Sequence, residues 1–271
     1  MSIKCIVVHM AYDQRHLARL RLSVGLAKRF DAHLNVVYAT PHPDYPAGMI
    51  GRAASLAFLD DAEKAEEGRV EAVRAEVEQV CKGLRSWEWH EEHGGVEELM
   101  APWAHLADLV VVEQEPSEHV EDAVMFHMAD HLVVSAGCEM LLVPWNWDGE
   151  VAGKRILVAW KNTAEAIKAI RGALSFLRDA EEVLVLASVS ETHAEVPGSD
   201  LASYLGHHGI KATVLPPNKK AGKGILNTAE QHGCDLMVMG AFSHSRLRQL
   251  FAGGATDYVM RHTTIPVLMR Q

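Results

Sequence analysis

The chain has 271 residues, and its 48% hydrophobic and 23% charged residues are typical of folded globular proteins. This composition excludes a mainly disordered, collagen-like or disulfide-rich chain, and the length favours two domains. The formal net charge of −10 excludes a general nucleic-acid binder and a protein held on an anionic membrane.

The N-terminus and the cysteines point to a cytoplasmic protein. The opening MSIKCIVVHM enters an apolar run directly, without the pattern of a signal segment. No apolar stretch reaches the ~18 residues that a membrane span needs. The cysteines stand far apart without a CxxC pair, which predicts structural thiols rather than disulfides or a zinc site. They are Cys5, Cys81, Cys138 and Cys234.

The first half contains five short apolar runs that predict strands. They are Lys4–Met10, His33–Ala39, Trp87–His90, Asp108–Glu113 and Met140–Val143. Most are continuous Val, Ile and Leu runs, which predict strands buried on both faces, as in parallel sheets. Between the second and third strands, Ala54–Leu84 keeps one apolar face at helical spacing and predicts a long helix. Three prolines make Pro41–Gly51 irregular.

The second half repeats this order of elements. Its strands are predicted at Arg155–Trp160, Val183–Ser188, Lys211–Leu215, Asp235–Gly240 and Pro266–Met269. Its helices include a shorter one at Ser199–His208 and a last one at Ala255–His262. Strand and helix alternate in both halves, which predicts an α/β fold with right-handed crossovers and one doubly wound sheet in each half.

The two halves begin and end with similar segments, which indicates a tandem duplication. KCIVVHM and KRILVAW each precede a polar turn and an amphipathic helix, and ADLVVVEQ matches CDLMVMGA. EMLLV matches IPVLM, at a spacing from the preceding segment that differs by one residue between the halves. The link Trp145–Gly153 therefore separates domains at 1–146 and 154–271. Both last strands are apolar and need cover, so we expect them to be neighbours about a pseudo-two-fold axis.

The halves differ in charge. Residues 1–150 contain 12 Lys and Arg against 26 Asp and Glu, whereas residues 151–271 contain 14 against 10. The segments that leave the carboxyl ends of the strands are acidic in the first half, at Glu91, Glu92, Glu97, Glu98, Glu115, Glu118, Glu121 and Asp122. The equivalent segments are basic in the second half, at Lys161, Lys219, Lys220, Lys223, Arg246 and Arg248. Each charge alone fits a solvated surface, but the sorting by sign predicts an anionic ligand in the second half only.

Glycines gather near the end of the second half, in GAFSHSRLRQLFAGGAT from Gly240 to Thr256. Gly240 ends a predicted strand, and Gly253 and Gly254 precede the last helix. Adjacent glycines before a helix let the backbone approach a ligand and leave N–H groups for an anion. A flexible loop with a tight turn has the same composition, so the spacing alone leaves both interpretations open.

This segment resembles the signature of the universal stress protein family, Gly-x-x-Gly, nine residues, then Gly-Ser/Thr. HSRLRQLFAGGATDYVMRHTTIPVLM and RILVAW are also similar to that family, and the likeness covers nearly the whole chain as two such domains. It implies two parallel five-stranded sheets in strand order 3-2-1-4-5, helices on both faces, contact through the last strands, and a role in stress tolerance. It also implies an ATP or AMP site, with Mg²⁺ when ATP is bound, and leaves open a homodimer and a protein partner.

The candidate nucleotide-binding residues, taken from the resemblance and from the basic segments together, all lie in the second half. They are Ala159, Lys161, Ser188, Gly240, Ser243, Arg246, Gly253, Gly254, Ala255 and Thr256. Ser243 and Gly254 depart from the family's Gly and Ser/Thr, and Lys161 replaces an acidic residue near the ribose. Several contacts use the backbone only and need no particular side chain.

The first half has lost the signature. Glu113 stands opposite Gly240, and counting from the chain end places His127 and Met128 opposite Gly253 and Gly254. Large side chains prevent the close backbone approach that glycine allows. We therefore expect no nucleotide in the first half.

Other sites have weaker support. Three histidine pairs suggest zinc, at His90 and His93, His127 and His131, and His207 and His208. None has a third ligand beside it, so we favour surface or capping histidines over a metal. Trp87, Trp89 and Trp103 stand among glutamates, which predicts packing rather than base stacking. The chain has neither a nucleophile elbow nor a P-loop lysine motif.

Two functions of different class remain. The first is a stress-response protein that binds ATP, ADP or AMP in its second half, with hydrolysis absent or very slow. The second is a ligand-free regulatory or protein-interaction module with an abandoned nucleotide site. The departures at Ser243, Gly254 and Lys161 favour the second. Gly240, Gly253 and the basic segments favour the first, which we prefer; a metal-responsive protein is a weaker third.

Overall fold

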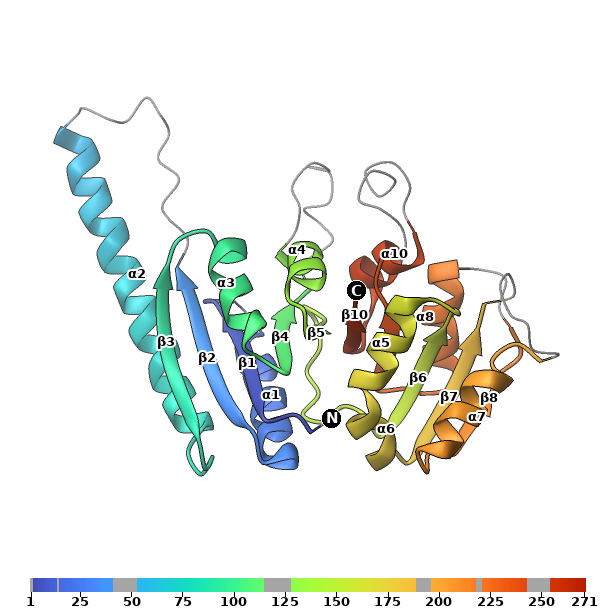
Figure 1. Ribbon diagram of the computed structural model, residues 1–271. Helices are drawn as coiled ribbons and strands as arrows, with labels where there is room; N and C mark the ends of the chain where they lie inside the picture. The colour runs from blue at the N-terminus through green and yellow to red at the C-terminus, as the bar shows by residue number, and fades with distance from the viewer. Residues whose placement is uncertain are drawn as a thin grey trace.

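The computed structural model describes residues 2–13, 15–40, 53–114, 128–188, 196–217, 221–242 and 254–271. Its strands form one ten-stranded sheet with helices on both faces (Figure 1). The strands are β1 (Cys5–Met10), β2 (His33–Thr40), β3 (Trp87–His93), β4 (Leu109–Glu113), β5 (Glu139–Val143), β6 (Arg155–Trp160), β7 (Glu182–Ala187), β8 (Ala212–Val214), β9 (Leu236–Gly240) and β10 (Val267–Arg270). The helices are α1 (His16–Phe30), α2 (Ala53–Val80), α3 (Val96–His105), α4 (Met128–Ser135), α5 (Ala164–Gly172), α6 (Leu174–Asp179), α7 (Ser199–His207), α8 (Ala221–Gln231) and α10 (Ala255–His262).

The two halves of the sheet have the same topology. The strand order is β3-β2-β1-β4-β5 in the first half and β10-β9-β6-β7-β8 in the second, which is the same order read from the opposite side. All neighbouring strands within a half are parallel. The predicted α/β class and the order 3-2-1-4-5 are confirmed.

The halves meet through their last strands, as predicted. β5 and β10 pair antiparallel, and the equivalent residues Leu141 and Leu268 lie opposite each other. The expectation of two separate sheets was wrong, because this pairing joins them into one. Each last strand would otherwise leave a row of buried N–H and C=O groups without partners, and pairing satisfies both rows.

Two apolar cores sandwich the sheet, and each runs through both halves. One core contains the inward side chains of α1, α2, α5, α6 and α7, and the other those of α3, α4, α8 and α10. The inward stripe of α2 is formed by Val70, Val73 and Val77, as the helical spacing predicted. Because both cores cross the β5–β10 joint, the halves share their hydrophobic stabilisation.

Two ion pairs connect the halves across the joint. Glu139 of β5 accepts a hydrogen bond from Arg270 of β10 at 2.8 Å, and the carboxylate is mostly buried. Arg29 of α1 reaches Asp179 at the end of α6, with 3.0 Å between Nε and Oδ2. These contacts fix the halves relative to each other at both the sheet and the helix layer.

Element ends differ from the predictions where tertiary pairing decides them. β3 extends to His93 because Thr40 at the end of β2 pairs with it. α2 ends at Val80, since the following residues form tight turns and Gly83 adopts a φ of 93° that continues no helix. Residues 41–51, predicted to be irregular, lie outside the described ranges.

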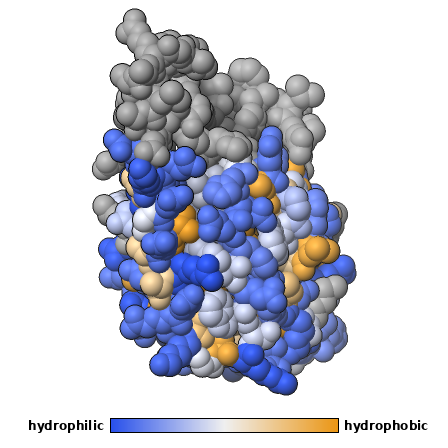
Figure 2. Space-filling view, turned by 90° about the vertical axis from the view of Figure 1, so that its left-hand side faces the viewer, coloured by the Kyte–Doolittle hydropathy of each residue, from blue (hydrophilic) through white to orange (hydrophobic). Residues whose placement is uncertain are grey.

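The outer wall of the first half is polar. Figure 2 shows this side of the molecule, where hydrophilic residues cover most of the described surface and apolar ones are scattered. Within the described ranges no helix combines the length and apolar character of a membrane span.

Candidate functional site

Four of the predicted binding residues stand at the carboxyl ends of adjacent strands in the second half. Ala159 is the last residue but one of β6, and Lys161 directly follows that strand. Ser188 follows β7, and its N–H donates to the carbonyl of Trp160 at 2.9 Å. Gly240 ends β9, the other neighbour of β6. Ligands of open α/β sheets bind at this edge.

The N-terminus of α10 lies in the same half and carries the other described candidates. Gly254 is its N-cap residue, without a capping side-chain hydrogen bond. Ala255 and Thr256 follow, and inside the helix their N–H groups have no acceptor. Asp257 is paired with Arg261 at 2.8 Å, so its carboxylate is neutralised along the helix. Helix N-termini of this kind attract anions.

Backbone strain is present just after β9, at Phe242. Phe242 has a φ of +46°, a left-handed conformation that is unfavourable for a bulky residue. Such strain is found mainly at ligand-binding and catalytic loops. The observation agrees with a functional role for the glycine-containing segment that follows.

Part of the predicted site lies outside the described residues. These positions are Ser243, Arg246 and Gly253, together with Lys219, Lys220, Arg248, His127, Glu115, Glu118, Glu121 and Asp122. Lys161 and Lys223 are the members of the basic set whose placement is described. The convergence of six cations on one edge therefore stays a prediction.

Close packing also explains why glycine is needed at position 240, without any ligand. A Cβ at this position would lie 2.5 Å from the backbone nitrogen of Ala166, at the start of α5. That helix start is fixed by Thr163, whose Oγ1 accepts from the same nitrogen at 3.3 Å. Gly240 thus lets α5 pack directly against the end of β9.

The strand registers align the two halves residue by residue. Ile6 pairs with Leu109 in the first half as Ile156 pairs with Leu236 in the second. Val110 pairs with Met140 as Met237 pairs with Val267, so the spacing from the fourth strand to the last is the same in both halves.

This alignment corrects two sequence-based expectations. The one-residue difference in spacing between the halves does not exist in the structure. α4 begins at Met128 and α10 at Ala255, so Met128 lies opposite Ala255 and His127 opposite Gly254. Glu113 lies opposite Gly240, as predicted.

At the edge where the second half has small residues, the first half has a polar cluster that is buried at His9 and Arg19 and half-buried at Asp13 and Glu113. Arg19 of α1 is 1% exposed. Its Nε donates to the carbonyl of His9 at 2.8 Å, its Nη1 to Glu113 at 2.8 Å and its Nη2 to Asp13 at 2.7 Å. We call these four residues the Arg19 cluster. The equivalent positions in the second half are Ala159, Thr163, Ala169 and Gly240.

Burial and charge set the ionisation of the Arg19 cluster. Burial, together with the positive charge of Arg19, lowers the pKa of His9 to about 3, so the imidazole is neutral. Burial raises the pKa of Asp13, but the adjacent guanidinium outweighs it and the net shift is downward. For Glu113 burial prevails over Arg19, and the pKa is raised. Both ring nitrogens of His9 lack a hydrogen-bond partner within the described structure.

Apart from Glu113, the residues of this cluster were not predicted from the sequence. One signal was present: Arg19 occupies an apolar-face position of the first helix, where the second half has alanine. A charged residue at such a position predicts a buried partner, because an unpaired charge is not tolerated in a core. The partners come from β1, from the turn that follows it and from β4, so sequence spacing did not reveal the whole set.

The remaining candidates behave as structural residues. Cys81, Cys138 and Cys234 are buried, and burial raises their pKa to about 11, 12 and 11. Trp87 and Trp89 pack on one core and Trp103 on the other, which confirms the packing prediction.

Several histidines of the predicted pairs have polar protein partners, whereas His127 lies outside the described residues. His90 lies 3.0 Å from the Asn35 amide oxygen, and His131 lies 3.5 Å from the Ser135 hydroxyl. In the described part of the chain, His, Cys, Asp and Glu side chains form no group of three or more suited to a metal ion.

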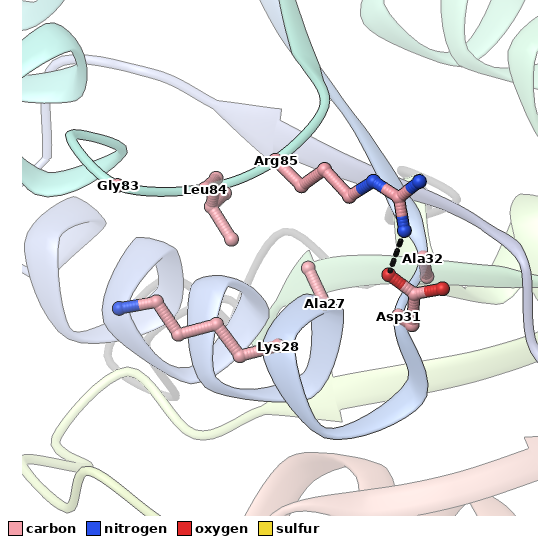
Figure 3. A pocket seen from close by; sticks show the side chains of 7 residues that line it. All are labelled: Ala27, Lys28, Asp31, Ala32, Gly83, Leu84 and Arg85. Atoms are coloured by element: carbon pink, nitrogen blue, oxygen red, sulfur yellow. Dashed lines mark hydrogen bonds and ion pairs between the residues drawn. The ribbon is translucent and has the colours of Figure 1, made fainter.

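A cavity of about 190 Å³ lies at the opposite end of the sheet, near the amino ends of β2 and β3 (Figure 3). Its rim includes Arg85, which reaches Asp31 at 3.4 Å, while Lys28 extends along α1 away from that pair. The cavity is separated by the length of the strands from the edge that carries the candidate site.

Residues 205–270 match the model of the Universal stress protein family. The match spans α10 and the whole segment from Gly240 to Thr256. The chain contains a universal stress protein domain. A universal stress protein of Synechocystis sp. is 46% identical over 48 residues, which is 18% of this chain and 17% of that protein.

Solved structures extend the likeness in fold to the whole chain. A universal stress protein from Archaeoglobus fulgidus aligns with a TM-score of 0.76 at 15% identity, over 100% of this chain and 99% of that one. A protein of unknown function from Pseudomonas aeruginosa PAO1 aligns with a TM-score of 0.61 at 18% identity, over 99% and 92%. The first half therefore shares the fold of the family, although its signature is absent.

Proposed function

We propose that this protein is a stress-response protein that binds one adenine nucleotide, ATP, ADP or AMP, at the carboxyl edge of its second half. The observation that carries the proposal is the combination of an uncapped helix N-terminus with small residues at the neighbouring strand ends. Free N–H groups favour a phosphate, and small side chains leave the backbone accessible. The family match over this region supports adenine nucleotides as the class of ligand.

The role is binding rather than catalysis. The side chains of Lys161, Ser188 and Thr256 carry no carboxylate or imidazole that could activate a water molecule. The nearby carboxylate of Asp257 is paired with Arg261. We expect hydrolysis to be absent or very slow, with Mg²⁺ entering only as the counter-ion of ATP. The same family membership supports a cytoplasmic location.

In this proposal the first half is a second domain that has no nucleotide site. We infer a tandem duplication with domains at 1–146 and 154–271, supported by the matching strand orders and registers. The Arg19 cluster occupies the edge of the first half that corresponds to the proposed site. One ligand per chain is the expected stoichiometry.

A ligand-free interaction module is the second candidate function. The packing of Gly240 against α5 favours it, since that glycine would be retained without any ligand. Lys161 in place of the family's acidic residue points the same way. This candidate predicts no detectable binding at millimolar nucleotide.

The test begins with protein purified without added nucleotide. Acid-released material is analysed for ATP, ADP and AMP, and the emptied protein is titrated with each by calorimetry. We expect a single site whose affinity weakens between about 0.1 M and about 1 M salt, as the Debye length falls from about 10 Å to about 3 Å. Gly253→Val and Arg246→Glu/Arg248→Glu should each weaken binding, and unchanged affinity in both would show that the site lies elsewhere.

A further inference from the structure

Gln114 belongs to the first half, and its side chain forms a hydrogen bond to the second half. It follows β4, is 3% exposed, and its backbone N–H donates to the carbonyl of Val143 at 2.8 Å. Its side-chain Nε2 donates to the carbonyl of Met260 in α10 at 2.7 Å. The side-chain oxygen accepts from the backbone N–H of Trp145 at 3.4 Å. The amide is therefore held in one orientation from both ends.

The acceptor, the carbonyl of Met260, needs a donor from outside α10. Met260 belongs to the last turn, where helix carbonyls lack partners inside the helix. The residue itself is buried, so water does not readily replace a missing donor. A helix of eight residues is unstable alone and depends on such tertiary contacts.

α10 has a second support, from its own half. A Cβ at Gly222 of α8 would lie 2.6 Å from the Cβ of Tyr258, so the two helices approach closely. Figure 1 shows α10 between α8 and the central strands, near the joint of the halves. The helix is thus held by α8 on one side and by Gln114 at its C-terminal end.

The support is not reciprocal. The residue equivalent to Gln114 in the second half is Ala241, which has no donor in its side chain. In the first half, the end of α4 is capped from within that half, since His105 Nε2 lies 2.9 Å from the carbonyl of Ser135. Among the described residues, Arg29 also donates across the halves, to the carbonyl of Phe176 in the last turn of α6 at 3.4 Å. In the other direction, Arg270 donates to the carbonyl of Gly137 at 2.7 Å, two residues beyond the end of α4 and not to a carbonyl of that helix.

We propose that Gln114 is a positioning residue, through which the first half fixes α10 and so the anion-binding N-terminus of that helix. The ligand part of this inference rests on the proposed function, whereas the helix part does not. The half that lacks the signature then has a structural role, because it orders the candidate site of the other half.

The test compares Gln114→Met, which keeps the length of the side chain but removes the donor, with His105→Ala, which removes the equivalent cap on α4. Amide hydrogen exchange is followed in α10 and, as an internal reference, in α1. In Gln114→Met we expect exchange in α10 to accelerate about tenfold relative to α1, the factor for one lost buried hydrogen bond. His105→Ala should leave α10 unchanged.

Ligand binding provides the second readout. Because α10 would contact the phosphates, Gln114→Met should weaken ATP binding about tenfold and leave adenosine binding unchanged. Unchanged α10 exchange, or equal acceleration in α1 and α10, would overturn the inference. If the wild-type protein binds no nucleotide, the proposed function fails, and the exchange experiment still decides the role of Gln114.

Discussion

The two halves of this sheet have the same strand order, but the residues at the carboxyl ends of their strands differ in chemical character. Four equivalent positions hold His9, Asp13, Arg19 and Glu113 in the first half, where they form one hydrogen-bonded cluster. In the second half the same positions hold alanine, threonine, alanine and glycine. A few side chains can therefore change the chemistry of one sheet edge while the fold stays the same, which is why function must be argued from the site.

The largest effect is expected from breaking the Arg19 cluster. Arg19→Met keeps most of the packing but leaves Asp13 and Glu113 without their buried cation, at a cost of about 3–5 kcal/mol. Urea unfolding measures the loss. In Arg19→Met/Glu113→Gln one uncompensated charge is removed, so at least about 1 kcal/mol should return. A loss below about 1 kcal/mol in the single variant would show that the cluster is not structurally important.

The neutral, buried His9 should make the protein sensitive to acid. The unfolded chain protonates this histidine near pH 6.5, whereas the folded protein does so only near pH 3. The unfolded state therefore binds more protons in this interval, and stability falls as the pH falls. Between pH 6.5 and 4.5 His9 contributes a loss of about 2–3 kcal/mol.

His9→Leu tests that assignment, with urea unfolding measured at several pH values. The variant should lose this part of the pH dependence. The raised pKa of Glu113 acts in the opposite sense, and the lowered pKa of Asp13 acts in the same sense at lower pH. Equal slopes for the variant and the wild type would contradict the assignment to His9.

Two glycines of the second half should differ in their effect on stability. Gly240→Ala places a Cβ 2.5 Å from the start of α5 and should cost about 1–3 kcal/mol. Gly254 is exposed, has a φ of −87°, and no described residue lies within 4 Å of an added Cβ. Gly254→Ala should therefore stay within about 0.5 kcal/mol of the wild type. Similar thermal unfolding of the two variants would refute the packing role of Gly240.

The sequence predicted the elements well because continuous apolar runs and helical spacing are local signals. The ends of α10, Ala255 and His262, are as predicted, and the order of strands follows the family resemblance. The joining of two sheets into one was not predicted, since it depends on which edges meet in space.

The candidate site was predicted only in part, because local spacing reveals equivalent positions but not long-range contacts. Gly240 and Glu113 were recognised as equivalent from strand spacing. The bonds of Arg19 and Gln114 join residues far apart in the chain, and no local pattern encodes such a pairing. What the sequence could show was the sign of the charges and the size of the side chains.

The central claim is that the second half binds the nucleotide and the first half is closed to it. Calorimetric titration with ATP tests it on the wild type and on a matched pair of variants, Ala159→His and His9→Ala, which exchange the residues of one equivalent position. We expect one ATP per chain, loss of binding in Ala159→His with its thermal unfolding still cooperative, and unchanged affinity in His9→Ala. Two ATP per chain, or binding that survives in Ala159→His and is lost in His9→Ala, would contradict the account.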